Sequence, residues 1–155
     1  MNAIAVFAIN KDLKLVIDDH FKDIRIQPLM QSVWTHLYRR SYAGPRRKLY
    51  VYFHEKRMEV FSFQQNRFRF SNSYEATNEH DALYYLLYIW KLTGMDVEKD
   101  ELYIVGDIHY QDWLIDKVKQ HLKFCRVINQ EVYFNNSQLA KRTDIPYDMK
   151  TIYLE

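Results

Sequence analysis

The pattern of apolar and polar positions changes character after about residue 43. Residues 3–9 form a short apolar run and predict a buried strand. Asn10 is placed to cap a helix that follows. The apolar side chains of this helix recur at helical spacing, at Leu13, Val16, Ile17 and Phe21. Residues 24–27 predict a second strand. Pro28 fits the first turn of a second helix, which carries Met30, Val33, Trp34 and Leu37 on one face. The beginning of the chain therefore predicts strand, helix, strand, helix.

A basic stretch with a Gly-Pro pair, "RRSYAGPRRK" at residues 39–48, separates this region from the next and is the best candidate for a linker. Three strands follow, at residues 49–53, 58–63 and 67–70, and the first is apolar throughout, as expected for a central strand. A helix is predicted from Asn78 to residue 93, with Gly94 placed to end it. A strand at "ELYIVGD", an amphipathic helix at 112–122 and a strand at 124–128 complete the pattern.

From residue 47 to residue 128 the order is strand, strand, strand, helix, strand, helix, strand. Two hairpins followed by two right-handed crossovers give a mixed sheet. This order predicts an α/β protein with a ribonuclease H-like core and helices on both faces of the sheet. The actin and heat-shock-chaperone ATPases use that core twice in each molecule.

Composition indicates the size and the cellular compartment of the protein more than its function. The 155 residues suffice for one ordinary domain or two small lobes, and hydrophobic residues make up 48% of them. A net charge of +2 gives no strong attraction to nucleic acid or to a membrane surface. Cys125, the single cysteine, cannot form an internal disulfide, and the longest apolar run, residues 82–90, is far shorter than a membrane span. We therefore predict a cytoplasmic protein without a membrane partner.

Three stretches resemble a known family: "FAINKDLKLVIDDHF", "RRKLYVYFHEKRMEVFSFQQNRFRFSNSYEATNEHDALYYLLYIW" and "DELYIVGDI". They are similar to the C-terminal half of a bacterial family of unknown function. Its fold is that of the actin-like ATPases, distantly similar to pilus-assembly ATPases. The resemblance implies that residues 1–43 are the end of a first lobe and residues 44–155 are a second lobe. It also implies a further N-terminal half, so that the chain looks like a fragment.

The resemblance directs attention to the turn after the first strand of the second lobe. Actin-like ATPases place an Asp-x-Gly motif there, and paired glycines after the fourth strand. The matching turn here has His54, Glu55 and Lys56 with no glycine, and after the fourth strand Gly106 stands alone before Asp107. We interpret these five residues as a vestigial nucleotide cleft. We assign no catalytic residue, no cofactor and no metal site.

Two other chemistries compete with structural roles for the same residues. Two-metal nuclease chemistry would require Glu55, Asp107 and Asp81 to converge, and a metal site would require His54 and His109 to meet beside Asp107. Neither set has a specific spacing. We interpret Asp81 as supporting its helix terminus, Cys125 as a buried inert thiol, and the tyrosines of residues 78–93 as core.

The favoured function is a non-catalytic, degenerate actin-like scaffold that binds a protein partner or a second copy of itself, and a homodimer is one form this could take. Exposed strand edges in the first segment would favour such pairing. One alternative is an ATPase whose phosphate-binding residues lie mainly in the missing half. A second alternative, which the near-neutral charge disfavours, is nucleic-acid binding through a basic group of side chains, Arg39, Arg40, Arg46 and Arg47.

Overall fold

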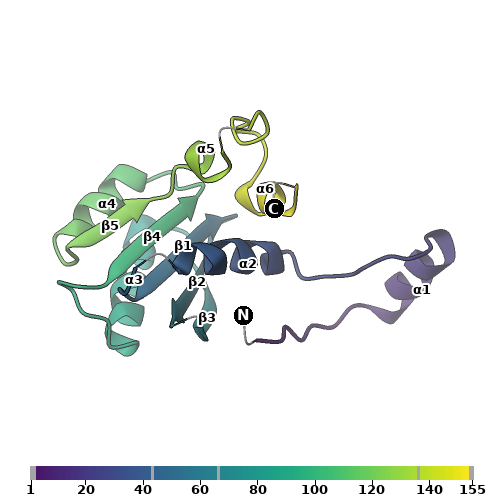
Figure 1. Ribbon diagram of the computed structural model, residues 1–155, viewed down its shortest axis with the longest axis horizontal. Coiled ribbons are helices and arrows are strands. Elements are labelled where there is room, and N and C mark those ends of the chain that lie inside the picture. Colours follow the sequence, from purple (N-terminus) through teal and green to yellow (C-terminus); the bar gives the residue numbers. More distant parts are fainter. Residues whose placement is uncertain (1–2, 43, 66, 136, 154–155) are drawn as a thin grey trace.

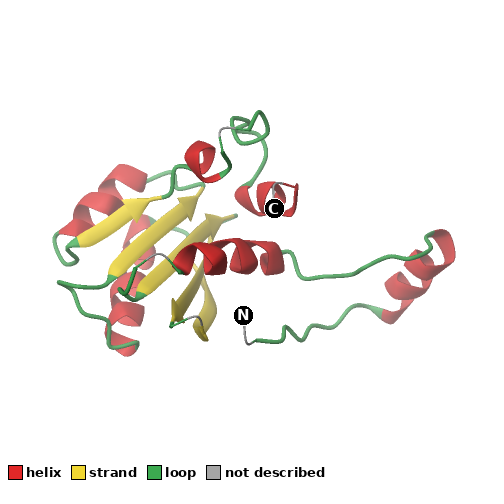
Figure 2. Ribbon diagram, viewed as in Figure 1, coloured by secondary structure: helices red, strands yellow, loops and turns green. Residues whose placement is uncertain are grey.

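The computed structural model describes residues 3–42, 44–65, 67–135 and 137–153, which form a five-stranded sheet with helices on both faces (Figures 1 and 2). The strands are β1 (Lys48–His54), β2 (Arg57–Gln64), β3 (Arg67–Glu75), β4 (Glu101–Gly106) and β5 (Phe124–Val127). The helices are α1 (Lys11–His20), α2 (Met30–Ser41), α3 (Glu79–Leu92), α4 (Gln111–Lys119), α5 (Gln130–Tyr133) and α6 (Tyr147–Tyr153).

The sheet has the order β3-β2-β1-β4-β5, with β1 at its centre. Strand β1 is antiparallel to β2 and parallel to β4, where Lys48 lies opposite Glu101 and Phe53 opposite Gly106. Strand β5 extends the parallel side and β3 the antiparallel side. The predicted mixed sheet with helices on both faces is therefore confirmed.

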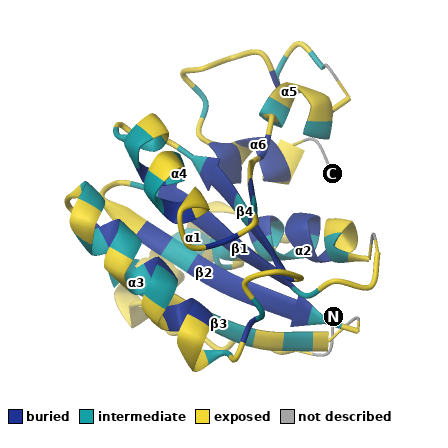
Figure 3. Ribbon diagram, turned by 90° about the vertical axis from the view of Figure 1, so that its left-hand side faces the viewer, coloured by how far each residue is buried: buried dark blue, intermediate teal, exposed yellow. Residues whose placement is uncertain are grey.

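Alternate residues of β1 face two separate cores, because successive side chains of a strand point to opposite faces. Leu49, Val51 and Phe53 belong to a core that α3 and α4 cover, with Leu86, Ile89, Leu114 and Val118 from those helices. Tyr50 and Tyr52 belong to an aromatic core on the other face, covered by Val33 and Leu37 of α2, Phe134 after α5 and Tyr147 of α6. Figure 3 shows β1, β2 and β4 as mostly buried, whereas β3 at the edge has no buried residue among its described residues.

The first segment, residues 3–29, extends away from the body as an arm with α1 at its far end (Figure 1). Asn10 caps α1 as predicted, accepting bonds from the amides of Asp12 and Leu13. The strands predicted at residues 3–9 and 24–27 were wrong, because both stretches are irregular and exposed in the described structure. A strand needs a neighbour for its amides and carbonyls, and no other described strand pairs with either stretch.

The linker prediction needs a smaller correction, because α2 extends to Ser41 and so includes Arg39 and Arg40. Helix α2 packs on the sheet and on α6, where the Thr151 hydroxyl donates to the Ser32 hydroxyl at 2.9 Å. The boundary predicted between residues 43 and 44 falls at Ala43, which lies outside the described residues. The two-lobe division remains a prediction.

Helix α3 begins after Asn78 and stops before Gly94, as predicted. Its tyrosines are not all core: Tyr84 is 63% exposed and Tyr88 is 48% exposed, with their rings stacked 6.1 Å apart. The prediction failed because no second layer covers the outer face of α3 within the described part of the chain. None of the described helices is long and apolar enough to cross a membrane.

Candidate functional site

The turn between β1 and β2 is a two-residue hairpin built without glycine. Glu55 and Lys56 both have positive φ, 45° and 63°, which the primed hairpin turns require and which glycine or asparagine usually supplies. The Lys56 carbonyl accepts a bond from the amide of Ala76 at 2.8 Å, which ties the turn to the end of β3. Each position of the turn therefore carries a side chain, as the sequence predicted.

Gly106 ends β4 directly beside the end of β1. Its φ is +111°, and a Cβ there would lie 2.8 Å from the Phe53 nitrogen and closer still to the Phe53 carbonyl oxygen. The Asp107 amide donates to that same carbonyl at 3.1 Å. Glycine is thus required because the backbone of β1 passes too close for any side chain.

A cleft of about 600 Å³ lies at this edge of the sheet. His54, Glu55, Gly106 and Asp107 line it, so the structure brings together four of the five residues predicted for the vestigial cleft. The fifth, Lys56, is exposed at the turn and does not line it. The opposite wall is the segment 143–148 with Lys150, which sequence reasoning did not assign to the site.

The cleft is acidic. Its described lining has four carboxylates and one lysine, namely Glu55, Asp107, Asp144, Asp148 and Lys150. Lys150 is buried, and its ammonium donates to the Gln130 amide oxygen at 2.9 Å and the Ala140 carbonyl at 3.2 Å. Burial lowers the pKa of Lys150, whereas a hydrogen bond from Arg142 lowers the pKa of Asp144 to about 2. Arg142 compensates the charge of Asp144, and the remaining three carboxylates against one lysine still oppose phosphate binding.

The carboxylates and histidines near this cleft form neither the two-metal nuclease site nor the histidine metal site. Asp81 lies at the start of α3, held by the side chains of Thr77 and Asn78, and does not line the cleft. His54 stacks on the Tyr52 ring at 4.9 Å, while His109 faces Asp107 in solvent. Among the residues that the structure describes, no group of three or more His, Cys, Asp or Glu side chains could hold a metal ion.

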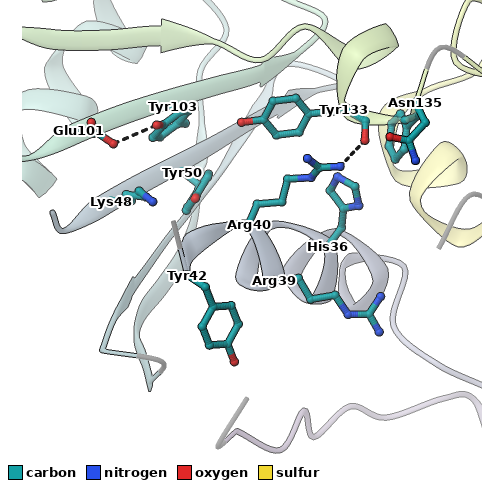
Figure 4. Close-up of a pocket in the computed structure, with 11 residues that line it drawn as sticks. His36, Arg39, Arg40, Tyr42, Lys48, Tyr50, Glu101, Tyr103, Tyr133 and Asn135 are labelled. Carbon is teal, nitrogen blue, oxygen red and sulfur yellow. Dashed lines mark hydrogen bonds between the residues drawn. The ribbon is translucent and has the colours of Figure 1, made fainter. Parts of the chain in front are cut away.

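A second, larger pocket of about 880 Å³ lies at the opposite end of β1 (Figure 4). Its walls come from the last turn of α2, the first residues of β1 and β4, and the end of α5. The lining consists of three cations, one carboxylate, one histidine and a set of aromatic and polar side chains: His36, Arg39, Arg40, Tyr42, Lys48, Tyr50, Glu101, Tyr103, Tyr133, Phe134 and Asn135. We call it the basic pocket.

The charge of Glu101 is already compensated at the edge of the basic pocket. One carboxylate oxygen accepts from Arg46 at 3.2 Å and the other accepts from the Tyr103 hydroxyl at 2.9 Å. Lys48 is buried opposite Glu101 and donates to the Ser41 carbonyl at 3.2 Å. Burial lowers the pKa of Lys48, and the charge of Glu101 partly opposes this. The lining as a whole is positively charged.

Aromatic rings form much of the rest of the basic pocket. The rings of Tyr50 and Tyr103 stack 5.3 Å apart, and the Arg40 guanidinium lies 4.4 Å from the centre of the Tyr133 ring and donates to the Tyr133 carbonyl. Burial and the bond to Glu101 raise the pKa of Tyr103 to about 12, so its hydroxyl remains protonated. Burial, with the charges of Arg40 and Arg39, lowers the pKa of His36 to about 4, so His36 is neutral near pH 7.

The sequence carried a signal for this pocket. Strand β1 begins "KLYVY", which places Lys48, Tyr50 and Tyr52 on one face, and a lysine on that face is unusual for a strand buried on both sides. The prediction treated β1 as uniformly apolar and so missed Lys48. It therefore also missed Glu101 and Tyr103, which lie beside Lys48 and Tyr50 on the neighbouring strand β4.

The basic group predicted for nucleic acid is divided by the fold. Arg39 and Arg40 line the basic pocket. Arg46 pairs with Glu101 and lies over the Phe124 ring at 4.2 Å. Arg47 pairs with Asp100 at 2.7 Å and donates to the Gly94 carbonyl. The four arginines therefore do not form one basic surface: Arg46 and Arg47 are engaged in ion pairs, and Arg40 contacts Tyr133. The predicted inert thiol, Cys125, is buried, and burial raises its pKa to about 11.

Comparison with known proteins agrees with this architecture. A crystal structure from Bacteroides thetaiotaomicron, described as a protein with actin-like ATPase fold and unknown function, matches with a TM-score of 0.75 and 21% identity. The match covers 93% of this chain and 51% of that chain, so this chain spans about half the length of the solved relative. No curated protein matches the sequence.

The family comparison covers most of the chain and agrees with the sequence resemblance. Residues 1–125 match the model of the family described as protein of unknown function (DUF3822). The strand order, the two helical layers and the solved relative all indicate the same fold. The chain therefore belongs to the DUF3822 family and has the fold of the actin-like ATPases.

Proposed function

We propose that this chain is a non-catalytic actin-like scaffold that acts by binding another polypeptide through its arm, residues 3–29. The observation that carries the proposal is the exposure of apolar side chains along that arm. Ile4 and Val6 are 91% and 92% exposed, and eight further large apolar side chains there are exposed, namely Phe7, Leu13, Leu15, Val16, Phe21, Ile24, Ile26 and Leu29.

An apolar surface of this size is unusual for a chain that acts alone. Full burial of one such side chain contributes about 1.5–3 kcal/mol, so the arm offers a gross gain on the order of 10 kcal/mol before the costs of association. Helix α1 buries none of its residues against the body. The irregular stretches beside it have backbone groups available for pairing with a strand of another chain.

The end of the sheet supports the non-catalytic part of the proposal. The β1–β2 turn has side chains at both central positions, and the adjoining cleft has four carboxylates against one lysine in its described lining. A triphosphate without its metal would be repelled there. The wall formed by the segment 143–148 further limits access to the ends of β1 and β4.

A second copy of the chain is the first partner to test. Sedimentation equilibrium from about 1 to several hundred μM should show a mass that rises with concentration. This range detects association free energies of about 5–8 kcal/mol, which is what remains of the gross gain after the costs of association. Replacing Ile4 and Val6 by glutamate should restore the monomer without changing the circular dichroism spectrum, since both side chains lie in solvent in the monomer. Leu92→Glu, on the exposed face of α3, is the matched control and should leave association unchanged. Monomeric mass throughout would refute self-association.

Titration calorimetry with ATP and magnesium on the full-length protein distinguishes the ATPase alternative from the scaffold proposal. The scaffold proposal expects no saturable heat. Saturable micromolar binding would overturn the non-catalytic role. Heparin chromatography separates the nucleic-acid alternative, which expects retention that falls steeply with salt. Because Arg46 and Arg47 are engaged in ion pairs, we expect weak retention.

A further inference from the structure

We infer that the basic pocket is a binding site for a small phosphate monoester that carries a planar ring. This site is separate from the acidic cleft and independent of the scaffold role. Lys48 begins β1 and His54 ends it, so the two cavities lie about 20 Å apart along the strand.

The cations of the basic pocket point to an anionic ligand. Arg40 is exposed and held in place by the carbonyl and the ring of Tyr133, both of which are uncharged, so its guanidinium charge remains available to an anion. Lys48 lies on the floor of the same cavity. The carboxylate of Glu101 repels such an anion only weakly, because Arg46 and the Tyr103 hydroxyl already bind its two oxygens.

The aromatic surface points to a flat group on the same ligand. Figure 4 shows Tyr50, Tyr103 and Tyr133 between the sheet and α2, with Arg40 reaching into the space beside them. Tyr50 is buried and already stacks on Phe61 and Tyr103, so the half-buried rings of Tyr103 and Tyr133 supply the faces for a ligand. Tyrosine faces bind planar rings by stacking, and the arginine beside them adds a cation–π contribution. A volume of about 880 Å³ is ample for a ligand the size of a nucleoside monophosphate.

Neutral hydrogen-bonding groups complete the arrangement. His36 is neutral near pH 7 because its pKa is lowered, and Asn135 lies beside it in the lining. Such groups orient a ligand without adding charge. A divalent phosphate would therefore be bound chiefly by Arg40, with the buried charge of Lys48 adding attraction at longer range, and the ring chiefly by Tyr103 and Tyr133.

The test uses adenosine monophosphate as the probe, with adenosine and inorganic phosphate as its two separate halves, in a titration followed by amide chemical shifts. We expect saturable binding of the monophosphate, at least about tenfold tighter than either half. The largest shifts should fall at Arg40, Lys48 and Tyr133. Arg40→Gln should weaken binding about tenfold while the spectrum stays folded, since Arg40 is exposed.

Three further variants make the result specific. Tyr103→Leu and Tyr103→Phe both remove the hydroxyl that binds Glu101, and only the second keeps the ring. Tyr103→Leu should weaken adenosine and Tyr103→Phe should retain it, which tests the stacking part. Arg142→Gln, a cation near the acidic cleft, is the matched control and should change nothing. Absence of saturable binding, binding as tight to Arg40→Gln as to the unmodified chain, or shifts centred on His54 and Gly106 would each overturn the inference.

Discussion

Gly106 shows how the contact between two backbones determines a residue type. The parallel pairing of β1 and β4 brings Phe53 and Gly106 opposite each other, and the chain then bends so that the Asp107 amide bonds the Phe53 carbonyl. The space that a side chain would need is already filled by main-chain atoms. The glycine is therefore explained by packing, without any phosphate.

We predict that Gly106→Ala lowers the free energy of unfolding by about 3 kcal/mol, from the positive φ and from the clash with Phe53. Gly94→Ala is the matched control, because Gly94 also has a positive φ, +61°, but has open space around it. It should lose only about 1 kcal/mol. Urea unfolding measures both. Equal losses would show that backbone strain alone, and not the close approach of β1, requires Gly106.

His36 links stability to pH. Burial, with the nearby Arg40 and Arg39, lowers its pKa to about 4 in the folded protein, against about 6.5 in the unfolded chain. Between these values the unfolded chain binds more protons than the folded protein. The contribution of His36 is therefore fully present above pH 6.5 and is lost as the pH falls toward 4.

We predict that urea unfolding between pH 7 and pH 4.5 shows a loss of stability, about 2 kcal/mol of which comes from His36. His36→Phe keeps a ring against Phe134, whose centroid lies 4.8 Å away, and removes the titration. The variant should lose less stability over the same pH range. If the two proteins lose the same amount, the titrating group is elsewhere.

At the scale of elements, α1 and α3 begin with the same device in different surroundings. Asn78 accepts bonds from the amides of His80 and Asp81, both at 3.0 Å, and α3 is packed on the sheet. Asn10 caps α1 in the same way, yet α1 has no buried residue. The effect of a cap on global stability should therefore depend on whether its helix is packed.

We predict that Asn78→Ala lowers the free energy of unfolding by about 1 kcal/mol. Asn10→Ala should reduce helix content slightly and leave the unfolding midpoint of the body unchanged at low protein concentration. Circular dichroism at 222 nm, recorded during urea titration, distinguishes the two. A similar shift of the midpoint in both variants would mean that the arm is packed on the body in solution.

The elements of the body could be predicted from the sequence because local signals and tertiary packing agree there. Asn78 and Gly94 mark the ends of α3. The apolar stretches of β1 and β4 become the buried centre of the sheet. The residues 3–9 and 24–27 have an equally strong apolar pattern but form no strand. Periodicity describes which face would be buried, and it cannot supply the neighbour that buries it.

The two cavities also differed in how far the sequence could predict them. The cleft beside Gly106 was predictable because its residues end adjacent parallel strands, which brings them together in any such sheet. The basic pocket depends on where α2 and α5 cross the sheet, and that position is set by tertiary packing. Arg40 and Tyr133, which are 93 residues apart, could not be paired from spacing.

At the scale of the whole molecule, the arm is the least protected part of the chain. Its described residues are almost all exposed, whereas β1 and β4 are buried. We predict that trypsin at low protein concentration cuts first within the arm, at Lys11, Lys14, Lys22 or Arg25, and leaves the body intact. Mass spectrometry of the early products identifies the sites.

The same digestion also reports on association. At concentrations where sedimentation shows a dimer, cleavage in the arm should slow by about tenfold or more, because cleavage then requires the arm to be released. The Ile4→Glu, Val6→Glu variant should be cut at the monomer rate at every concentration. Early cleavage inside β1 to β4 would contradict the description of a stable body with an exposed arm.

The outstretched arm also has a hydrodynamic consequence. Because α1 lies far from the sheet, the monomer has a larger frictional coefficient than a sphere of 19.0 kDa, and it should elute from a sizing column ahead of compact proteins of its mass. A second copy that folded both arms inward could elute at almost the same volume. Retention time is therefore a poor guide to the stoichiometry of this molecule, and the diffusion coefficient has to be read together with the mass.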